Sequence, residues 1–247
     1  MARLDGKVAL ITGAARGMGR SHALRLAADG ANVAALDIAA DIPTVGYPLG
    51  TAAELAETVA GVEAAGRKGL ALTADVRDLP AMRSAVEDTV AAFGRLDIVI
   101  ANAGIALPTW DVDDAQAFAD QIAVNLTGVW NTVHVAAPAM IEAGNGGSVV
   151  LISSVMGLSG RTGGGNGTAD GYIAAKHGQV GLMRGWARWL APHDIRVNSI
   201  HPSGVATPMV LNDAMTALFA DKEPPKHGSD VGNLLDVTIL QPGDISN

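Results

Sequence analysis

The chain has 247 residues, of which 49% are hydrophobic and 17% charged, so it can form one α/β domain or two small ones around a large buried core. The formal net charge of −8 argues against nucleic acid and anionic membrane surfaces as partners, because these favour a basic face. Without cysteine there are no disulfides, thiolate nucleophiles or cysteine metal sites, and no metal is expected. No apolar run approaches the roughly 18 residues of a membrane span, and the first residues do not resemble a signal peptide, so a cytoplasmic protein is expected.

Strand-like and helix-like segments alternate along the chain. Short apolar runs predict strands at 7–12, 31–37, 68–75, 96–104, 147–154 and 195–202. Helical periodicity predicts helices at 19–30, 51–66, 78–94, 113–143 (one or two helices) and 170–192. Thr51 is expected to cap the second helix, with Glu54 at capping-box spacing. This alternation indicates a single Rossmann-type domain over 1–247, with a doubly wound parallel sheet and helices on both faces.

Three segments depart from this rhythm. An insert at 38–50 separates the second strand from its helix, and 160–171 is a glycine-rich loop. The last residues, 239–247, read as the opening of a helix near Pro242 or Asp244. We therefore expect the sheet to lack its final, C-terminal strand.

A glycine-rich turn, "TGAARGMG" at 12–19, follows the first strand and opens the first helix. Gly13, Gly17 and Gly19 allow a tight turn and close approach of a pyrophosphate, which the free N–H groups of the helix N-terminus would bind. A glycine-rich turn without a ligand is the alternative, and the strand and helix around it make that alternative weaker.

Asp37 ends the second predicted strand, 18 residues after Gly19. A carboxylate at this position accepts hydrogen bonds from adenosine ribose hydroxyls and repels a 2′-phosphate, so NAD is favoured over NADP. Arg16, in the glycine-rich turn, could meet a 2′-phosphate instead, and Asp37 could be a solvated carboxylate at a strand end. We consider Asp37 the stronger signal.

Polar side chains gather near the expected carboxyl ends of the later strands. Tyr172 and Lys176 are four residues apart in a predicted helix and therefore project from one face. Ser154 closes the fifth strand, and Asn125 interrupts an otherwise apolar helical stretch. Taken singly, these residues would be surface side chains, a helix cap and a buried amide. Their occurrence together after a nucleotide-binding pattern indicates an active site.

Over nearly its whole length the sequence resembles the short-chain dehydrogenase/reductase family. The residues and motifs that carry the resemblance are "TGAARGMG", Asp37, "DV" at 75–76, "NAG" at 102–104, Asn125, Ser154, "YIAAK" at 172–176 and "RVNSIHPSGVATPM" at 196–209. The insert, within "DIAADIPTVGYPLGTAAELAETV" at 37–59, resembles the mycofactocin-associated, carveol-dehydrogenase-like branch.

The resemblance implies an NAD-dependent oxidoreductase acting on alcohols or ketones. Tyr172 would be the general acid/base, Lys176 would stabilise its phenolate and hold the nicotinamide ribose, and Ser154 would bind the substrate oxygen. Asn125 would hold a water that links Lys176 to solvent. The implied cofactor contacts are Gly13, Arg16, Gly17, Met18, Gly19, Asp37, Asp75, Val76, Asn102, Ala103, Gly104, Tyr172, Lys176, Val205 and Thr207.

Two departures from the family pattern affect these assignments. The resemblance implies that the Val205 backbone meets the nicotinamide carboxamide. Ser203 separates Pro202 from Gly204 here, where the family usually has Pro-Gly directly, and this departure bears on the Val205 contact. The gap of 18 residues between Ser154 and Tyr172 is long, and Ser153 or Ser159 would be the alternative to Ser154. The extra residues are either a loop at the pocket rim or a neutral surface insertion.

The expected substrate is an apolar secondary alcohol or ketone, terpenoid-like or cyclic. Candidate pocket residues, each of which could equally belong to the core, are Ile105, Leu107, Trp110, Met156, Leu158, Met209, Leu218 and Phe219. Segment 208–240 is expected to be a substrate lid. The insert is expected to cover the adenosine, so that NAD is tightly retained and reoxidised in place by an external redox carrier. By resemblance the chain would form a homotetramer through helices around 115–143 and 170–191. The alternatives are an NADPH-dependent 3-ketoacyl reductase, a non-catalytic dinucleotide sensor and, more weakly, an epimerase.

Overall fold

Six strands form one parallel sheet in the computed structural model, which describes all residues except 1, 107–112, 160–164, 214, 217–236 and 238. The strands are β1 (Val8–Thr12), β2 (Asn32–Asp37), β3 (Gly69–Thr73), β4 (Ile98–Ala101), β5 (Gly147–Ile152) and β6 (Ile195–Ile200). Their order across the sheet is β3-β2-β1-β4-β5-β6. The order reverses between β1 and β4, and the crevice beyond the carboxyl ends of these two strands is where ligands bind in such sheets.

Helices connect the strands. The α-helices are α1 (Gly17–Ala28), α2 (Ala52–Ala64), α3 (Leu79–Phe93), α4 (Asp114–Ile122), α5 (Gly128–Ala143), α6 (Gly167–Leu190) and α8 (Pro242–Ser246). A π-helical segment, η1 (Ala123–Thr127), joins α4 to α5, and two short 3-10 turns are η2 (Val155–Gly157) and η3 (Ala191–His193). The capping box predicted for α2 is present, since Thr51 accepts from the Glu54 N–H and the Glu54 carboxylate accepts from the Thr51 N–H.

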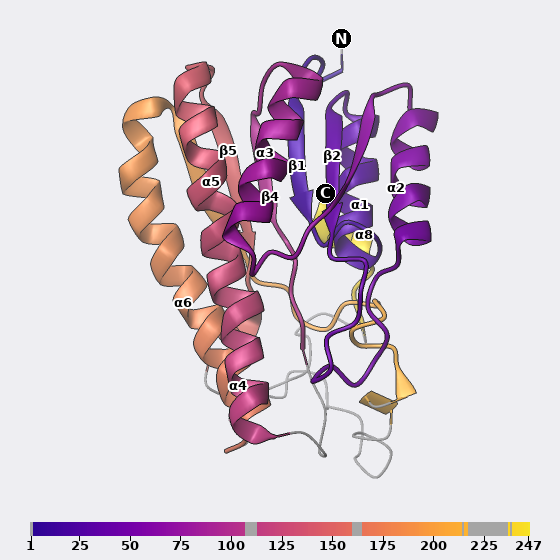
Figure 1. The fold of residues 1–247 in the computed structure, drawn as a ribbon, viewed down its shortest axis with the longest axis vertical. Coiled ribbons are helices and arrows are strands. Elements are labelled where there is room, and N and C mark those ends of the chain that lie inside the picture. The colour runs from indigo at the N-terminus through magenta and orange to yellow at the C-terminus, as the bar shows by residue number, and fades with distance from the viewer. Residues whose placement is uncertain (1, 107–112, 160–164, 214, 217–236, 238) are drawn as a thin grey trace.

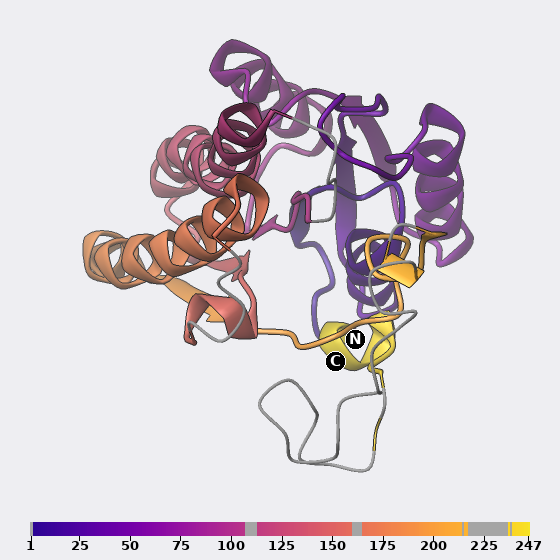
Figure 2. The same ribbon diagram turned by 90° about the horizontal axis from the view of Figure 1, so that it is seen from below.

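Two apolar layers hold the helices against the sheet. On one face, α1 and α2 bury Ala23, Ala27, Leu55 and Val62 against β1 and β2. On the other face, α3 and α5 bury Met82, Val86, Val133 and Met140, and Leu190 of α6 joins the same cluster. The helices accordingly lie on opposite sides of the sheet (Figure 1), and Figure 2 shows the same two layers from the end where the strands finish. The expected doubly wound fold with helices on both faces is confirmed.

Several boundaries differ from those predicted. β4 ends at Ala101 rather than at residue 104, because Asn102 and Ala103 turn their N–H groups toward the Thr12 hydroxyl. The helix expected from residue 170 begins at Gly167, where the Asn166 side chain caps it, so the predicted glycine-rich loop is shorter at that end. Its residues 160–164 lie outside the described part of the chain.

The end of the chain returns to the sheet's ligand side. Leu240 pairs in parallel with Val205, and α8 packs against α1, where Ser246 hydrogen bonds to Ser21 and His22. Pro242 opens this last helix, as expected. Instead of a seventh full strand, the described residues show this single bridge beyond β6.

Candidate active site

The glycine-rich turn after β1 is held by Asn102, which follows β4. Its amide donates to the main-chain oxygens of Thr12 and Gly13, at 2.9 and 3.1 Å. Gly13 has a φ of +67°, and a Cβ there would lie 2.8 Å from Ala103 Cα. A Cβ on Gly19 would lie 2.0 Å from the Gly13 oxygen. These close approaches explain the glycine spacing without a ligand, but the turn also leaves the N-terminus of α1 open to a pocket.

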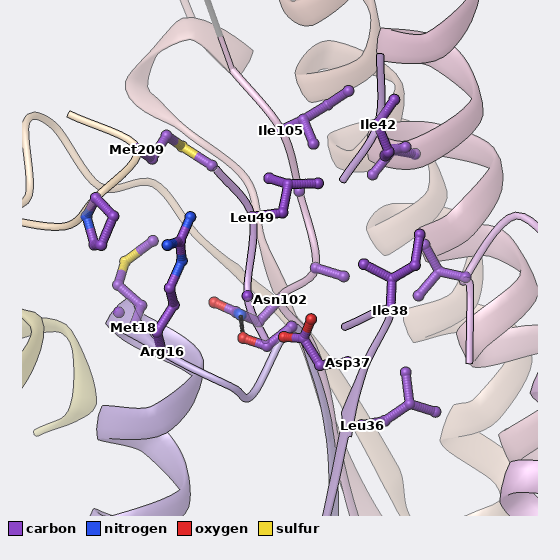
Figure 3. A pocket seen from close by; sticks show the side chains of 18 of the residues that line it. Arg16, Met18, Leu36, Asp37, Ile38, Ile42, Leu49, Asn102, Ile105 and Met209 are labelled. Atoms are coloured by element: carbon purple, nitrogen blue, oxygen red, sulfur yellow. Dashed lines mark hydrogen bonds between the residues drawn. The ribbon is translucent and has the colours of Figure 1, made fainter. Parts of the chain in front are cut away.

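That pocket lies at the carboxyl ends of β1, β2 and β4. Its lining includes most of the predicted cofactor residues: Gly13, Arg16, Gly17, Met18, Asp37, Asp75, Val76, Asn102, Ala103, Gly104 and Thr207. Gly19 and Val205 are outside the lining, as are Tyr172 and Lys176. Figure 3 shows Arg16, Met18 and Met209 on one side of the pocket, Ile38 and Ile42 on the other, and Leu49 between them. The structure thus brings the predicted nucleotide residues together around one cavity.

Asp37 is buried at the floor of this pocket and is held by two main-chain donors. Its carboxylate oxygens accept from Ala15 N–H at 3.0 Å and Ala39 N–H at 3.1 Å. Each oxygen retains a further lone pair, because a carboxylate offers about four acceptor sites. The carboxylate can therefore accept two ribose hydroxyls while it keeps its own position.

Asp75 also lines the pocket. Arg77 binds it with a salt bridge of 2.7 Å, and also lies 3.6 Å from Asp120. Burial acts to raise the pKa of Asp75, but hydrogen bonds and charge from Arg77 outweigh burial and hold the pKa below its usual value. Arg77 was not predicted as a site residue; its position two residues after Asp75 is the signal that could have identified it.

The insert 38–50 covers one side of the pocket, and three contacts fix it. The Arg16 guanidinium donates to the Pro48 oxygen, the Thr44 hydroxyl donates to Asp120 at 2.7 Å, and Ala106 N–H donates to the Tyr47 hydroxyl at 3.3 Å. Arg16 thus contacts the insert as well as lining the pocket. Burial raises the pKa of Tyr47 to about 12, so this phenol stays neutral. Tyr47 was not predicted, although the chain has only two tyrosines.

Two of the four predicted catalytic residues, Asn125 and Lys176, lie beside Gly104, and Tyr172 lies next to Lys176. A Cβ on Gly104 would lie 2.8 Å from Asn125 Oδ1 and 3.7 Å from Lys176 Nζ. Lys176 Nζ lies 5.5 Å from the centre of the Tyr172 ring and donates to the Ile152 oxygen at 2.8 Å. The Ser154 side chain acts on the Tyr172 phenol and favours its charged form. Gly104 also lines the nucleotide pocket, so Asn125 and Lys176 adjoin one of its lining residues.

Burial shifts the pKa values of Tyr172 and Lys176, the two titrating groups of this cluster. It raises the pKa of Tyr172 above that of a free phenol, while the Ser154 hydrogen bond acts in the opposite direction. It lowers the pKa of Lys176 to about 7, because a buried ammonium loses its hydration. Two groups whose pKa values have been moved away from water values, next to a cleft, are typical of acid/base sites.

Asn125 lies in the π-helical segment and is fully buried. Its side chain exchanges two hydrogen bonds with the main chain of Ile105, at 3.0 and 2.9 Å, and donates to Gln121 at 2.6 Å. Its main-chain oxygen accepts from Gln179 at 2.6 Å. Short π-helical segments such as η1 occur often at functional sites. Gln121 and Gln179 were not predicted. The spacing of four residues to Asn125 is the signal that could have identified Gln121, whereas only the folded chain brings Gln179 to Asn125.

The serine assignment can be compared with its alternatives. The Ser153 hydroxyl donates to the Lys176 main-chain oxygen at 3.0 Å, so it ties β5 to α6. The Ser159 hydroxyl donates to the Val155 oxygen within its own turn. Of these three side chains, that of Ser154 acts on the Tyr172 phenol and favours its charged form. The geometry favours Ser154.

Only some of the residues predicted to contact the substrate line the pocket. Ile105 and Met209 line the pocket, whereas Met156 and Leu158 do not, and Leu158 is 60% exposed. Leu107, Trp110, Leu218 and Phe219 lie outside the described residues, as does much of the proposed lid. Within the described part of the chain, no helix is long and apolar enough to cross a membrane.

Comparison with known proteins agrees with this geometry. A family model described as short chain dehydrogenase matches residues 7–216. The (-)-trans-carveol dehydrogenase of Rhodococcus erythropolis is 47% identical, over 100% of this chain and 90% of that protein. The trans-4-hydroxycyclohexanecarboxylate dehydrogenase of Sinomonas cyclohexanicum is 43% identical, over 84% of this chain and 75% of that protein. The crystal structure of carveol dehydrogenase from Mycobacterium avium in complex with NAD superposes with a TM-score of 0.88, at 44% identity, covering 100% of this chain and 90% of that one.

The fold and the site define a dinucleotide-dependent oxidoreductase of the α/β class. The chain belongs to the short-chain dehydrogenase family, and its carveol-dehydrogenase-like character is confirmed by these relatives.

Proposed function

We propose that the protein is an NAD-dependent oxidoreductase that interconverts an apolar secondary alcohol, terpenoid-like or cyclic, and its ketone. The observation that carries the proposal is that Lys176, with the Tyr172 ring next to it, lies beside Gly104, which lines the same pocket as Asp37. The Ser154 side chain acts on the Tyr172 phenol. When bound, NAD supplies the acceptor for the hydride that leaves the alcohol carbon.

Tyr172 exchanges the proton of the substrate oxygen. Its phenol needs stabilisation of the charged form, because burial alone raises its pKa. The Lys176 ammonium, 5.5 Å from the ring centre, and the Ser154 hydrogen bond both act toward the phenolate. Ser154 also stabilises negative charge on the substrate oxygen. With its pKa near 7, Lys176 can pass a proton onward at neutral pH.

Asn125 maintains the wall of this path. Its side-chain bonds to Ile105 fix the loop after β4, and its main-chain oxygen faces α6 at Gln179. We propose that a water bound near this oxygen links Lys176 to solvent.

The residues present fit NAD. The Asn102 Oδ1 atom is buried and has no hydrogen-bond partner among the described residues, the turn at Gly13 has no room for a Cβ, and Asp37 supplies a fixed carboxylate. Gly13, Gly17, Met18 and Gly19 would hold the pyrophosphate end, and Asp37, Asp75 and Val76 the adenosine. Asn102, Ala103 and Gly104 would line the path to the nicotinamide, which Val205 and Thr207 would contact. Asp37 disfavours the NADPH-dependent ketoacyl reductase alternative.

The substrate class rests on the apolar residues Ile105 and Met209 and on the relatives, which are named for cyclic alcohols. We infer a small apolar alcohol or ketone for this chain. Segment 208–240 would act as the lid over it.

The insert supports retention of the cofactor. It is tied to the glycine-rich turn by Arg16, to α4 by Asp120 and to the loop after β4 by Ala106. All three contacts must open before the pocket widens on this side. We propose that the cofactor leaves slowly and that the NADH formed by alcohol oxidation is reoxidised in place by an external redox carrier, as the resemblance to the mycofactocin-associated branch implies.

The proposal also covers the oligomeric state of the protein and its location in the cell. Exposed Phe118, Trp130 and Trp189 lie on α4, α5 and α6, the helices expected to form subunit contacts, so we propose a homotetramer. We propose that it works in the cytoplasm.

The test combines a cofactor measurement with a substrate panel. The purified protein is denatured gently, and released NAD or NADH is measured by mass and absorbance. Turnover is then measured with trans-carveol, cyclohexanol and related alcohols, using NAD, NADP and an artificial electron acceptor. We expect stoichiometric NAD and turnover that Tyr172→Phe lowers by at least 10²-fold. A dinucleotide sensor would bind NAD but show no turnover, and free NADH formed over many turnovers would contradict retention.

A further inference from the structure

The peptide unit that follows Ser154 is held at both of its polar atoms by the residues after β6. His201 Nδ1 lies 3.0 Å from the Ser154 oxygen, and Val155 N–H donates to the Pro202 oxygen at 3.0 Å. The peptide group between Ser154 and Val155 thus contacts two consecutive residues, His201 and Pro202, of the loop that follows β6. The Ser153 N–H, on the other side, donates to the Ile200 oxygen at 2.9 Å.

The hydrogen-bond partners determine the tautomer of His201. A carbonyl oxygen can only accept, so Nδ1 carries the proton and donates to Ser154. In the neutral ring Nε2 is then an acceptor, and Ser199 Oγ lies 2.8 Å from it. Ser199 therefore donates to Nε2 and holds the ring in the orientation that Ser154 needs. The imidazole is half-buried between the ends of β5 and β6.

The backbone at Ser154 controls where its hydroxyl lies. Ser154 is in an extended conformation and caps η2, where Met156 N–H donates to its Oγ at 3.1 Å. The Ser154 side chain also acts on the Tyr172 phenol, whose pKa it lowers against the effect of burial. A rotation of the following peptide plane would move the Ser154 backbone and break this arrangement. Displacements near 1 Å at a reacting group can lower rates by about 10²-fold.

We propose that His201 is a positioning residue for Ser154, acting through the Ser154 carbonyl rather than on the substrate. The inference rests on the proposed role of Ser154 in alcohol oxidation. The positioning depends on one hydrogen-bond donor, the Nδ1–H group of His201. A side chain that supplies a donor to the Ser154 oxygen can therefore replace histidine.

The experiment compares two substitutions that differ in that donor. His201→Asn places an amide nitrogen near the position of Nδ1, whereas His201→Leu keeps similar bulk and removes the donor. Both are assayed with the alcohol of the panel that the wild type oxidises fastest. We expect His201→Leu to lower kcat about tenfold with little change in KM, and His201→Asn to restore kcat to within about threefold of wild type.

A double-mutant cycle with Ser154→Ala tests the route of the effect. If His201 acts through Ser154, adding His201→Leu to Ser154→Ala lowers kcat by less than about twofold more. His177→Leu is the matched control, because His177 Nδ1 also lies 3.0 Å from a main-chain oxygen, that of Ile173, but on an exposed face of α6. We expect this control to keep wild-type kcat.

The outcomes separate the inference from the proposed function. Full activity of His201→Leu, or an equal loss in the Ser154→Ala background, overturns the positioning role. Full activity of both Ser154→Ala and Tyr172→Phe, or no turnover by the wild type, overturns the proposed function instead. If His201→Leu does not fold, as judged by circular dichroism, His201→Gln replaces it, since it keeps a polar side chain but moves the donor away from Nδ1.

Discussion

Lys176 carries the strongest electrostatic constraint of any single residue in the candidate site. It is 4% exposed, and no carboxylate lies within ion-pair distance of it in the described part of the chain. Its ammonium is therefore stabilised by the Ile152 oxygen and the Tyr172 ring rather than by a counter-ion. A site of this kind keeps the proton of Lys176 exchangeable near pH 7.

Lys176→Met is expected to change how stability depends on pH. The pKa of Lys176 is about 7 in the folded chain and 10.5 as the reference value. Between these values the unfolded chain binds more protons at this residue, so its contribution to stability rises with pH, by at most about 1.4 kcal/mol per unit. Below pH 7 the contribution is constant.

Denaturant unfolding of the cofactor-free proteins at pH 6, 7, 8 and 9 measures this. The difference in unfolding free energy, wild type minus Lys176→Met, should be flat from pH 6 to 7 and rise to pH 9. The exposed Lys68→Met should show no such rise. A flat difference throughout would mean that the folded pKa of Lys176 is not lowered.

Asp37 is expected to decide between the two dinucleotides. Asp37→Asn keeps the shape of the side chain and an oxygen acceptor but removes the charge that repels a 2′-phosphate. The ratio of kcat/KM for NAD to that for NADP should fall by about tenfold or more, about 1.4 kcal/mol. Steady-state kinetics with both cofactors checks this, with exposed Asp88→Asn as the control. An unchanged ratio would contradict the assignment of Asp37.

Among the elements, the insert 38–50 has the clearest mechanical role, because its contacts reach three other parts of the fold. Thr44→Val removes the hydroxyl that donates to Asp120 at 2.7 Å. A hydrogen bond to a charged group contributes about 1.5–3 kcal/mol, so NAD should dissociate about tenfold faster or more. Stopped-flow release of NAD measures the rate, and the exposed Thr73→Val, on the edge strand β3, should leave it unchanged. Equal rates in Thr44→Val and wild type would remove the insert from cofactor retention.

The order and type of the elements could be read from the sequence because each signal is local. The capping box of α2 involves residues three apart, and β1 is a continuous apolar run buried along its whole length. The π-helical turn at η1 could not be predicted in this way. It depends on the bonds of Asn125 to Ile105 and Gln179, which lie 20 and 54 residues away.

The site residues also divide into those that a local sequence pattern predicts and those that depend on long-range contacts. Tyr172 and Lys176 could be paired from their spacing, since helix geometry places i and i+4 on one face. The choice of Ser154 over Ser153, and the contacts of Tyr47 and His201, depend on how separate elements pack. Short-range patterns contain no information on those distances.

At the scale of the whole molecule, exposed aromatic residues predict assembly. Phe118 is 42% and Trp189 44% exposed, and both lie on helices proposed as subunit contacts. Trp189→Glu should weaken assembly, because a charge buried in an interface is costly. Light scattering after size-exclusion chromatography should give four times the chain mass for the wild type and smaller species for the variant. Leu211→Glu, outside those helices, should not change the mass; a monomeric wild type would contradict the tetramer.

The bridge between Val205 and Leu240 has a consequence for how this enzyme diversifies. Ala206 N–H donates to Leu240 and Leu240 N–H donates to Gly204, so the two ends of the intervening stretch are fastened together beside the glycine-rich turn. These hydrogen bonds fix the entry and exit points of that stretch. Related enzymes could exchange it as a cassette, acquiring a new substrate preference while the catalytic frame stays intact. We expect chimeras joined at 210 and 239, which retain Thr207 and Met209 of the pocket, to keep their NAD affinity and to take the alcohol selectivity of the donor.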